Sequence, residues 1–279
     1  MSIVAPNYSL PPPALEPRSR RTLAILEHQI REQSGALTWV LMAFIVIVVV
    51  LPLVLTVYLA RLVPNGLAGH TTLATFYGPV GQEVWFILLI LLVSSVGAAL
   101  IARDVATKAM TMYLARPIRP IDYLAAKAGS VGFWVFLGGV LPGWVGTIIL
   151  LSLGYVSLPL ALEAAGGYFV LGCFSIAAFT GISVLLSSMT ARSTLAGAGI
   201  LGGLLGSYIV MELLYAISGS ARFLYASPVA DLLGVGAGVF GASGNPIDPW
   251  WAGTFLVVFA FVAFELTYLR LRRAQAVSE

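Results

Sequence analysis

The chain has 279 residues, of which 59% are hydrophobic and 10% are charged, with a formal net charge of +3 and a mean hydropathy of +0.96. A soluble domain carries about 25% charged residues, and one core of this size cannot hide so large an apolar excess. The composition therefore excludes a soluble globular protein and predicts a protein embedded in lipid. The small positive charge gives no evidence of nucleic-acid binding.

The chain begins with a polar leader, residues 1–17, which contains the run SLPPPALEP and is expected to be disordered. In residues 18–38, Leu23, Leu26 and Ile30 fall near helical spacing, with charged side chains on the other faces. This pattern predicts an amphipathic helix lying on the cytoplasmic membrane surface. The alternative is an ordinary helical extension that carries positive charge on the inner side of the membrane.

Six apolar stretches follow, and an uncharged run of roughly 18 or more apolar residues is typical of a membrane-spanning helix. A β-barrel would need segments of roughly ten alternating residues, and runs such as VLMAFIVIVVVLPLVL do not alternate. The sequence predicts an all-α integral membrane protein with a six-helix transmembrane domain over 39–273 and a tail at 274–279. The expected spans are 39–60, 84–102, 131–151, 168–189, 194–215 and 250–269.

The distribution of lysine and arginine predicts the orientation of the spans. Of the 15 basic residues, only Arg61 and Arg222 fall on one side of the expected membrane. Because loops rich in lysine and arginine stay in the cytoplasm, both termini are expected to be cytoplasmic. The protein is expected to be a multi-pass protein of the cell (inner or plasma) membrane. The apolar connection between the fifth and sixth spans is expected to form short helices or a re-entrant hairpin.

Two strings match the pattern GxGxxG, at 197–202 and 236–241. Neither follows a strand or precedes the acidic residue that a dinucleotide site requires. Small residues four apart let transmembrane helices approach closely, within one chain or between subunits. The glycines expected to pack in this way are Gly199 with Gly203, Gly202 with Gly206, and Gly139 with Gly143.

The sequence offers no catalytic or metal-binding constellation. It has no GxxxxGK[ST] loop for ATP, and its two histidines, His28 and His70, lie outside the spans. Glu212 and Glu265 lie near span ends, where an interfacial position is favoured over a proton relay. No enzymatic activity, metal or cofactor is therefore expected on this chain. If it moves a substrate, the energy is expected to come from another polypeptide.

The connection between the second and third spans holds the densest group of charges and prolines. Pro117 cannot continue the preceding helix. Pro120 suits the first turn of a second, short helix, with Asp122 near its positive end. The pattern predicts a helix, a corner and a helix, with Arg116 and Arg119 projecting at the corner. Such a corner can transmit force into two spans, but an ordinary positively charged loop explains it equally well.

This segment, IARDVATKAMTMYLARPIRPIDYLAAK, resembles the corresponding segment of type-2 ABC exporter permeases, the ABC-2 family. Asp104 stands where that family usually has glutamate, and Pro120 stands where many relatives lack proline. VLLSSMTARSTLAGAGI resembles the family's turn between spans four and five, and LYASPVADLL its Ser-Pro segment before the last span. The resemblance covers most of 20–273. The positions that fit the first segment are Asp104, Thr107, Leu114, Pro117, Arg119 and Lys127.

The resemblance implies the transmembrane permease subunit of an ATP-binding-cassette exporter. Such permeases pair with a second permease copy or a homologous permease, and separate ATPase subunits bind the ATP and magnesium. The alternatives are a non-transporting membrane scaffold and a self-sufficient carrier. The residues implied in the contact with the ATPase are Arg116, Pro117, Arg119, Asp122 and Tyr123, with Arg31 and Glu32 as secondary candidates.

Overall fold

The computed structural model describes residues 18–62, 72–80, 83–107 and 119–278, and every regular element within them is helical. The leader, residues 1–17, lies outside the described part. In chain order the elements are α1 (Arg18–Gln33), α2 (Ala36–Leu62), α3 (Leu73–Val80), α4 (Glu83–Gly97), α5 (Ala102–Ala106), α7 (Pro120–Gly139), α8 (Leu141–Ser152), α9 (Leu158–Met189), α10 (Ser193–Ser218), the 3-10 helix η1 (Ala221–Ala226), α11 (Pro228–Phe240) and α12 (Pro249–Ser278).

Six helical stretches in the described part are long and apolar enough to cross a membrane. This finding confirms the prediction of an all-α chain with six such helices. The second stretch joins α4 to α5, and the third joins α7 to α8. The six are Ala36–Leu59, Val84–Ala106, Pro120–Ser152, Leu158–Met189, Ser193–Ser218 and Pro249–Arg273.

The third stretch corrects the sequence-based expectation of a short helix at Pro120 followed by a separate span from 131. One helix, α7, runs without a break from Pro120 to Gly139. Arg119 is its extended N-cap residue, Pro120 occupies the first turn, and Asp122 lies near the positive end of the helix. The expected start at Pro120 agrees with the structure. The helix then continues into the apolar run because the charge of Lys127 is paired with Asp104 inside the protein and does not require a loop.

A second proline explains the break between α7 and α8. Pro142 has no backbone N–H, so the carbonyl of Gly138, four residues earlier, loses its helical donor. The indole nitrogen of Trp85 donates to that carbonyl oxygen at 3.2 Å, in a buried position. Because a buried carbonyl without a donor is unfavourable, the Trp85 bond stabilises the break and ties α4 to α7.

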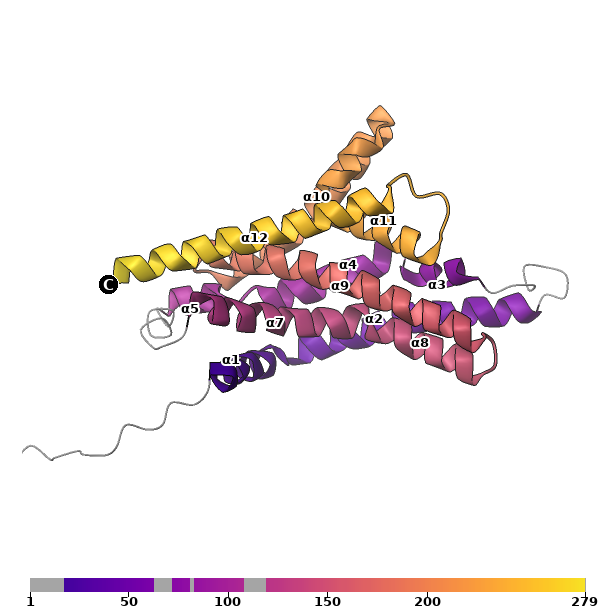
Figure 1. The fold of residues 1–279 in the computed structure, drawn as a ribbon, viewed down its shortest axis with the longest axis horizontal. Coiled ribbons are helices and arrows are strands. Elements are labelled where there is room, and N and C mark those ends of the chain that lie inside the picture. The colour runs from indigo at the N-terminus through magenta and orange to yellow at the C-terminus, as the bar shows by residue number, and fades with distance from the viewer. Residues whose placement is uncertain (1–17, 63–71, 81–82, 108–118, 279) are drawn as a thin grey trace, which may run out of the picture.

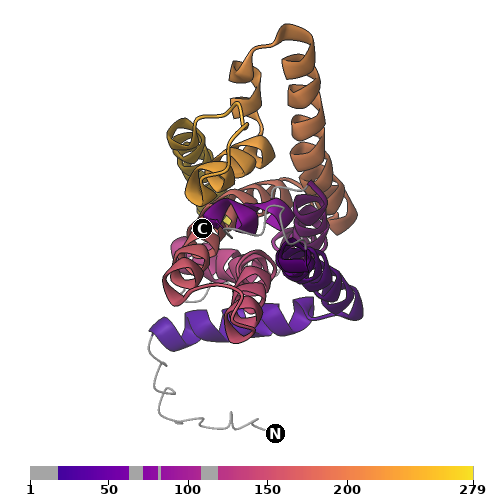
Figure 2. The ribbon, with the colours of Figure 1, turned by 90° about the vertical axis from the view of Figure 1, so that its right-hand side faces the viewer.

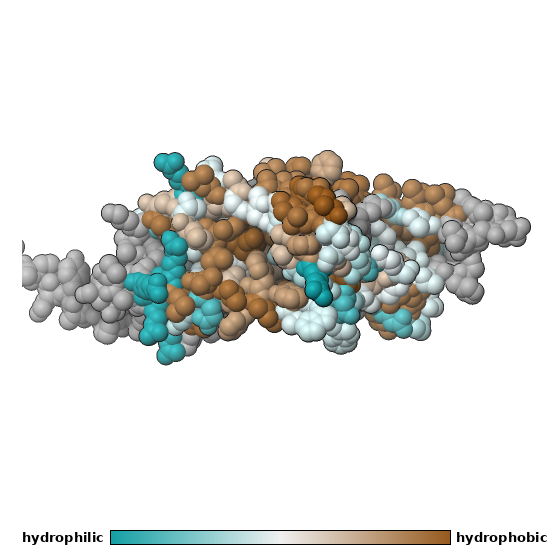
Figure 3. All heavy atoms as spheres, turned by 90° about the horizontal axis from the view of Figure 1, so that it is seen from above, coloured by the Kyte–Doolittle hydropathy of each residue, from teal (hydrophilic) through white to brown (hydrophobic). Residues whose placement is uncertain are grey.

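The helices form an elongated bundle (Figure 1). We call the end that holds α1, α5 and the C-terminal part of α12 the basic end, because its described arginines include Arg31, Arg103, Arg192 and Arg270. The opposite end, with α3 and the turn between α8 and α9, is the distal end. Figure 3 shows hydrophilic side chains gathered towards the basic end and hydrophobic ones over much of the middle.

Helix α1 lies across the bundle. Figure 1 shows it nearly end-on, whereas Figure 2, turned by 90°, shows it along its length. It packs against α7. Gln29 and Ile30 turn towards the bundle, whereas Glu27, His28 and Arg31 are exposed. The crosswise direction gives one face of α1 a protein partner and leaves its charged face outside.

The core lies around α9, which contacts α7, α8, α11 and α12. Large side chains such as Trp85, Trp134 and Phe179 are fully buried there. The outside of the bundle is equally apolar, and Ile148, Phe261 and many others are exposed. Such a surface suits hydrocarbon rather than water as the surrounding medium.

Helix α10 differs from the other long helices because little of it is covered. Its buried residues are Ala196, Ile200 and Leu204, all in its first half. Figure 1 shows the helix leaving the bundle towards its C-terminal end. Gly219, at a φ of +69°, then ends it in the left-handed conformation that glycine adopts without strain.

The connection between α10 and α12 folds into η1 and α11, which confirms the expectation of short helices. The Ser-Pro pair there starts α11: the Ser227 hydroxyl accepts from the backbone N–H of Ala230 at 3.4 Å, and Pro228 occupies the first turn. Helix α11 packs against α9 and α12. Helix α11 is therefore largely part of the protein interior.

Candidate functional site

Four polar side chains meet inside the basic end, and we call them the basic-end cluster: Gln29 of α1, Asp104 of α5, and Tyr123 and Lys127 of α7. The Lys127 Nζ atom lies 2.8 Å from Asp104 Oδ2 and donates to Gln29 Oε1 at 2.6 Å. The Tyr123 hydroxyl donates to the same Asp104 oxygen at 2.6 Å. Tyr123 and Lys127 meet Asp104 together because residues four apart share one helix face.

The cluster encloses two opposite charges. The Lys127 side chain is 6% exposed and that of Asp104 is 14% exposed. The ring centroid of Tyr123 lies 5.6 Å from Lys127 Nζ, where an aromatic face attracts a cation. Removing either charge would leave the other buried and uncompensated, which is strongly unfavourable. The pair therefore holds α5 against α7, and Gln29 adds α1 to the same unit.

Further polar contacts surround the cluster. Arg103 forms an ion pair with Glu32. The Gln33 amide donates to the backbone oxygen of Val96 and to Ser130 Oγ, both at 3.2 Å. These bonds tie the end of α1 to α4, α5 and α7.

The end of α9 joins this assembly through Ser187. Its hydroxyl oxygen accepts from the backbone N–H groups of Ile101 and Ala102, at 2.8 and 3.0 Å. The first N–H groups of a helix have no partner within it, so Ser187 caps the start of α5 from a different helix. Two segments that carry the family resemblance, around Asp104 and around Ser187, thus meet at the basic end.

Of the main residues expected to contact an ATPase, the structure describes Arg119, Asp122 and Tyr123, which lie together at the start of α7. Arg116 and Pro117 lie outside the described residues. Arg119 is exposed, and its carbonyl oxygen accepts from the backbone N–H groups of Asp122 and Tyr123. Asp122 is half-buried, whereas Tyr123 is 1% exposed and belongs to the basic-end cluster.

The two secondary candidates lie on α1, in different settings. Arg31 forms an exposed pair with Glu27 within the helix. Glu32 forms an ion pair with Arg103 of α5. Glu32 therefore contributes to the attachment of α1, whereas Arg31 remains on the outer surface.

The glycines expected to pack helices fall into three groups. A Cβ at Gly143 would lie 2.4 Å from the Tyr168 ring, so α8 and α9 approach closely there. Cβ atoms at Gly199 and Gly203 would make ordinary contacts with α9, at 3.7 and 3.5 Å. At the remaining three, no described atom lies within 4 Å of the Cβ position; these are Gly139, Gly202 and Gly206.

Sequence reasoning missed the pairing at the basic end. It noted Asp104 and Lys127 only as matches to a family pattern, and it did not single out Gln29 or Ser187. The four-residue spacing of Tyr123 and Lys127 after Pro120 indicates a shared helix face, but it does not identify Asp104 as the partner of that face. Gln29 carries no comparable signal, because its partner lies in a different helix.

A buried acid at the start of α11 was missed as well. Asp231 is 2% exposed, and its Oδ1 atom has no hydrogen-bond partner among the described residues. Burial raises the pKa of Asp231 to about 8. The carboxyl group is therefore largely neutral at pH 7. Within the same residues, no group of three histidine, cysteine or acidic side chains could hold a metal ion.

No protein-family model and no curated protein sequence matches the chain. Its function is therefore inferred from the arrangement of its own residues. That arrangement is a multi-pass bundle of apolar helices, with a polar, buried junction of α1, α5, α7 and α9 at one end. Such a bundle suits a membrane protein of the transporter kind.

Proposed function

We propose that the chain is the transmembrane permease subunit of an ATP-binding-cassette exporter of the ABC-2 type, driven by separate ATPase subunits. One observation carries the proposal: the basic-end cluster joins α1, α5 and α7 around the buried pair of Lys127 and Asp104. The chain between α5 and α7 contains Arg116 and Pro117, the residues implied in ATPase contact. A partner bound there would act on three helices at once.

The continuity of α7 supports this mechanism. Its first residues, beside the exposed Arg119, are part of the same helix that continues into the third candidate span. A displacement at Arg119 would therefore move the span directly, without a flexible joint between them. The polar bonds to α1 and α5 would make the neighbouring helices follow.

The orientation belongs to the same proposal. We place the basic end in the cytoplasm of a cell (inner or plasma) membrane, because its arginines follow the positive-inside rule. The crosswise α1, with its charged face exposed, would then lie along the inner membrane surface. A second copy or a homologous permease would cover α10, where Gly202 and Gly206 are open and Ile209 and Leu213 are exposed.

The test is co-expression with candidate ATP-binding-cassette ATPases from the same organism, followed by purification and reconstitution in liposomes. We expect the two proteins to assemble and the ATPase to be stimulated, and the double variant Arg116→Glu with Arg119→Glu to lose both effects. Arg192→Glu with Arg270→Glu is the matched control, because these exposed arginines lie at the same end but outside the connection between α5 and α7.

Three results would contradict parts of the proposal. Assembly and stimulation that survive the double variant would exclude the docking role of the two arginines. Gradient-driven transport by this chain alone would make it a self-sufficient carrier. A stable complex whose ATP turnover never responds to a substrate would favour a membrane scaffold.

A further inference from the structure

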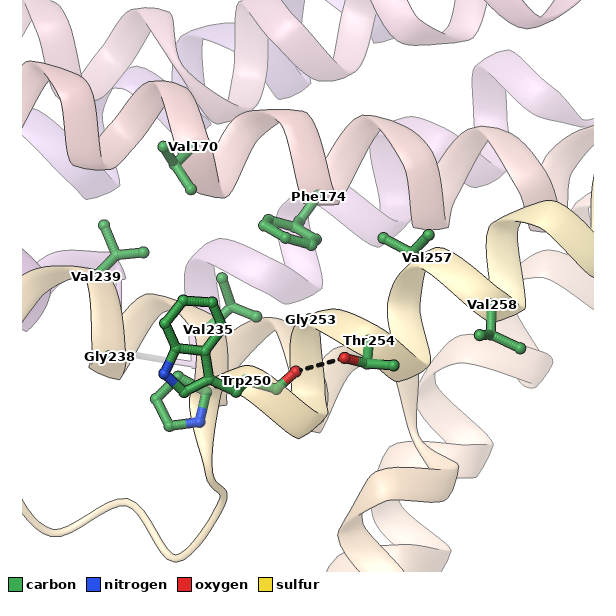
Figure 4. A pocket seen from close by; sticks show the side chains of 11 residues that line it. Val170, Phe174, Val235, Gly238, Val239, Trp250, Gly253, Thr254, Val257 and Val258 are labelled. Atoms are coloured by element: carbon green, nitrogen blue, oxygen red, sulfur yellow. Dashed lines mark hydrogen bonds between the residues drawn. The ribbon is translucent and has the colours of Figure 1, made fainter.

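A cavity of about 620 Å³ lies between α9, α11 and α12, on the distal side of the bundle. Figure 4 shows Val170 and Phe174 pointing into this space from α9, and Val257 pointing into it from α12. The hydroxyl of Thr254, also in the lining, donates to the backbone oxygen of Trp250 at 2.8 Å. Among the described residues that line the cavity, none is charged. The cavity therefore suits an apolar occupant.

The cavity opens towards the outside of the bundle rather than into its centre. Three of its lining residues, Val170, Val257 and Val258, are 40%, 56% and 53% exposed. The outside of a membrane-spanning helix is hydrocarbon, and water has no polar partners in such a space. Protein interiors seldom keep large voids. Hydrocarbon from the bilayer is therefore the material at hand to fill the cavity.

The dimensions favour a chain over a compact group. An apolar protein cavity of about 150 Å³ accommodates benzene, and the space of about 620 Å³ is several times larger. The α12 residues that line it extend from Pro249 to Val258, a rise of about 14 Å along the helix. An extended alkyl chain can lie along this length of α12.

The distal end of the cavity is marked by two exposed indoles. Trp250 is 86% exposed and Trp251 is 62% exposed, both in the first turn of α12. Tryptophan collects at the boundary between headgroups and acyl chains. An amphiphile with its polar group near Trp250 would direct its alkyl chain along α12 towards Val258.

We infer that the cavity binds one acyl chain of a bilayer phospholipid in the leaflet at the distal end. The acyl chain completes the packing between α9, α11 and α12, and the phospholipid headgroup lies beside Trp250. This inference requires only that the helices span a bilayer. It does not depend on an ATPase partner, so its failure and the failure of the proposed function can be told apart.

The test uses the full-length protein in phosphatidylcholine vesicles. A fraction of the phosphatidylcholine carries a photoactivatable diazirine in one acyl chain. After irradiation, mass spectrometry locates the labelled peptides. We expect several-fold more label at the cavity lining than at lipid-facing α12 residues outside it. Val257→Trp, which fills the cavity, should remove this excess. Val262→Trp should leave it unchanged, because Val262 is a similarly exposed valine (47%) on α12 that does not line the cavity.

A second variant separates filling of the cavity from misfolding of Val257→Trp. Val170→Trp fills the cavity from α9 and should cause the same loss of label, with each variant checked for a monodisperse elution profile. Equal labelling of lining and non-lining residues would overturn the inference, as would full labelling of a folded Val257→Trp or Val170→Trp protein. Native mass spectrometry that finds a retained adduct other than a phospholipid would overturn the assignment of the occupant.

Discussion

Two aspartates with little exposure to solvent, Asp104 at 14% and Asp231 at 2%, show two ways in which this protein accommodates a carboxyl group. Asp104, at the basic end, receives Lys127 and the Tyr123 hydroxyl on one of its oxygens. Asp231, at the start of α11, leaves Oδ1 without a hydrogen-bond partner in the described structure, and burial raises its pKa to about 8. A buried charge needs a partner or must be neutralised. The basic end uses the first solution and α11 the second.

The contrast suggests different mechanical roles. A fully paired cluster fixes helices in one arrangement, because every displacement breaks charged hydrogen bonds. A neutral carboxyl group can be buried without a charged partner, and it ionises as the pH rises. We therefore expect the junction of α1, α5 and α7 to resist deformation, and α11 to be the element whose stability changes with pH.

The largest effect is expected for Lys127→Met. The variant leaves Asp104 buried without its cation and should destabilise the protein by about 3–5 kcal/mol. Chemical unfolding in detergent measures the change. Adding Asp104→Asn should restore much of the loss, and Arg31→Met, in an exposed pair, should change little. If the double variant is as unstable as Lys127→Met, the buried charge is not the cause.

Tyr123→Phe tests a single hydrogen bond of the basic-end cluster. It removes the hydroxyl that donates to Asp104 and keeps the ring beside Lys127. A hydrogen bond to a charged group contributes about 1.5–3 kcal/mol, so the same unfolding assay should show a loss of that size. Tyr225→Phe is the control, because the Tyr225 hydroxyl accepts from the Asp248 backbone in an exposed position. Equal losses in both variants would remove any special role of the cluster.

Asp231→Asn tests the unpaired acid. The folded pKa of about 8 lies above the ordinary value of 3.8, so the native state binds the proton more tightly than the unfolded chain. The contribution of Asp231 to the free energy of unfolding is therefore fully present below about pH 4. As the pH rises to about 8, this contribution falls by about 1.4 kcal/mol per pH unit. Unfolding at several pH values measures this slope.

Asp231→Asn should abolish that slope, whereas Asp248→Asn should retain it, because Asp248 is an exposed acid that caps α12. Stability that is independent of pH in the unmodified protein, or a slope that survives Asp231→Asn, would mean that Asp231 is not the protonated group. It would also exclude the proposed difference between a paired Asp104 and a neutral Asp231.

The smallest effect is expected for Ser227→Ala, one turn before Asp231. The variant removes the side-chain cap of α11 and should cost about 1 kcal/mol. Ser227→Asp retains a capping oxygen, although it adds a charge at a fully buried position, so Ser227→Thr is the better conservative control. Thermal unfolding that shows no difference between the alanine and threonine variants would exclude a capping role.

Local signals predicted much of the fold. The number of long apolar helices follows from hydropathy alone, and the beginning of α7 follows from Pro120, which suits the first turn of a helix. The junction at the basic end could not be predicted in the same way. Lys127 and Gln29 are 98 residues apart, and no periodicity within either segment identifies the other.

The sequence by itself determined that this is an all-α, multi-pass membrane protein, because the hydropathy of each helix is a property of its own residues. The tertiary structure alone decided which polar groups are paired. It brought Lys127 to Asp104, Ser187 to the start of α5 and the Trp85 indole to the carbonyl freed by Pro142. It left Asp231 unpaired among the described residues. The physical reason is that a hydrogen bond requires two groups within about 3 Å, and only the packing of distant segments sets such distances.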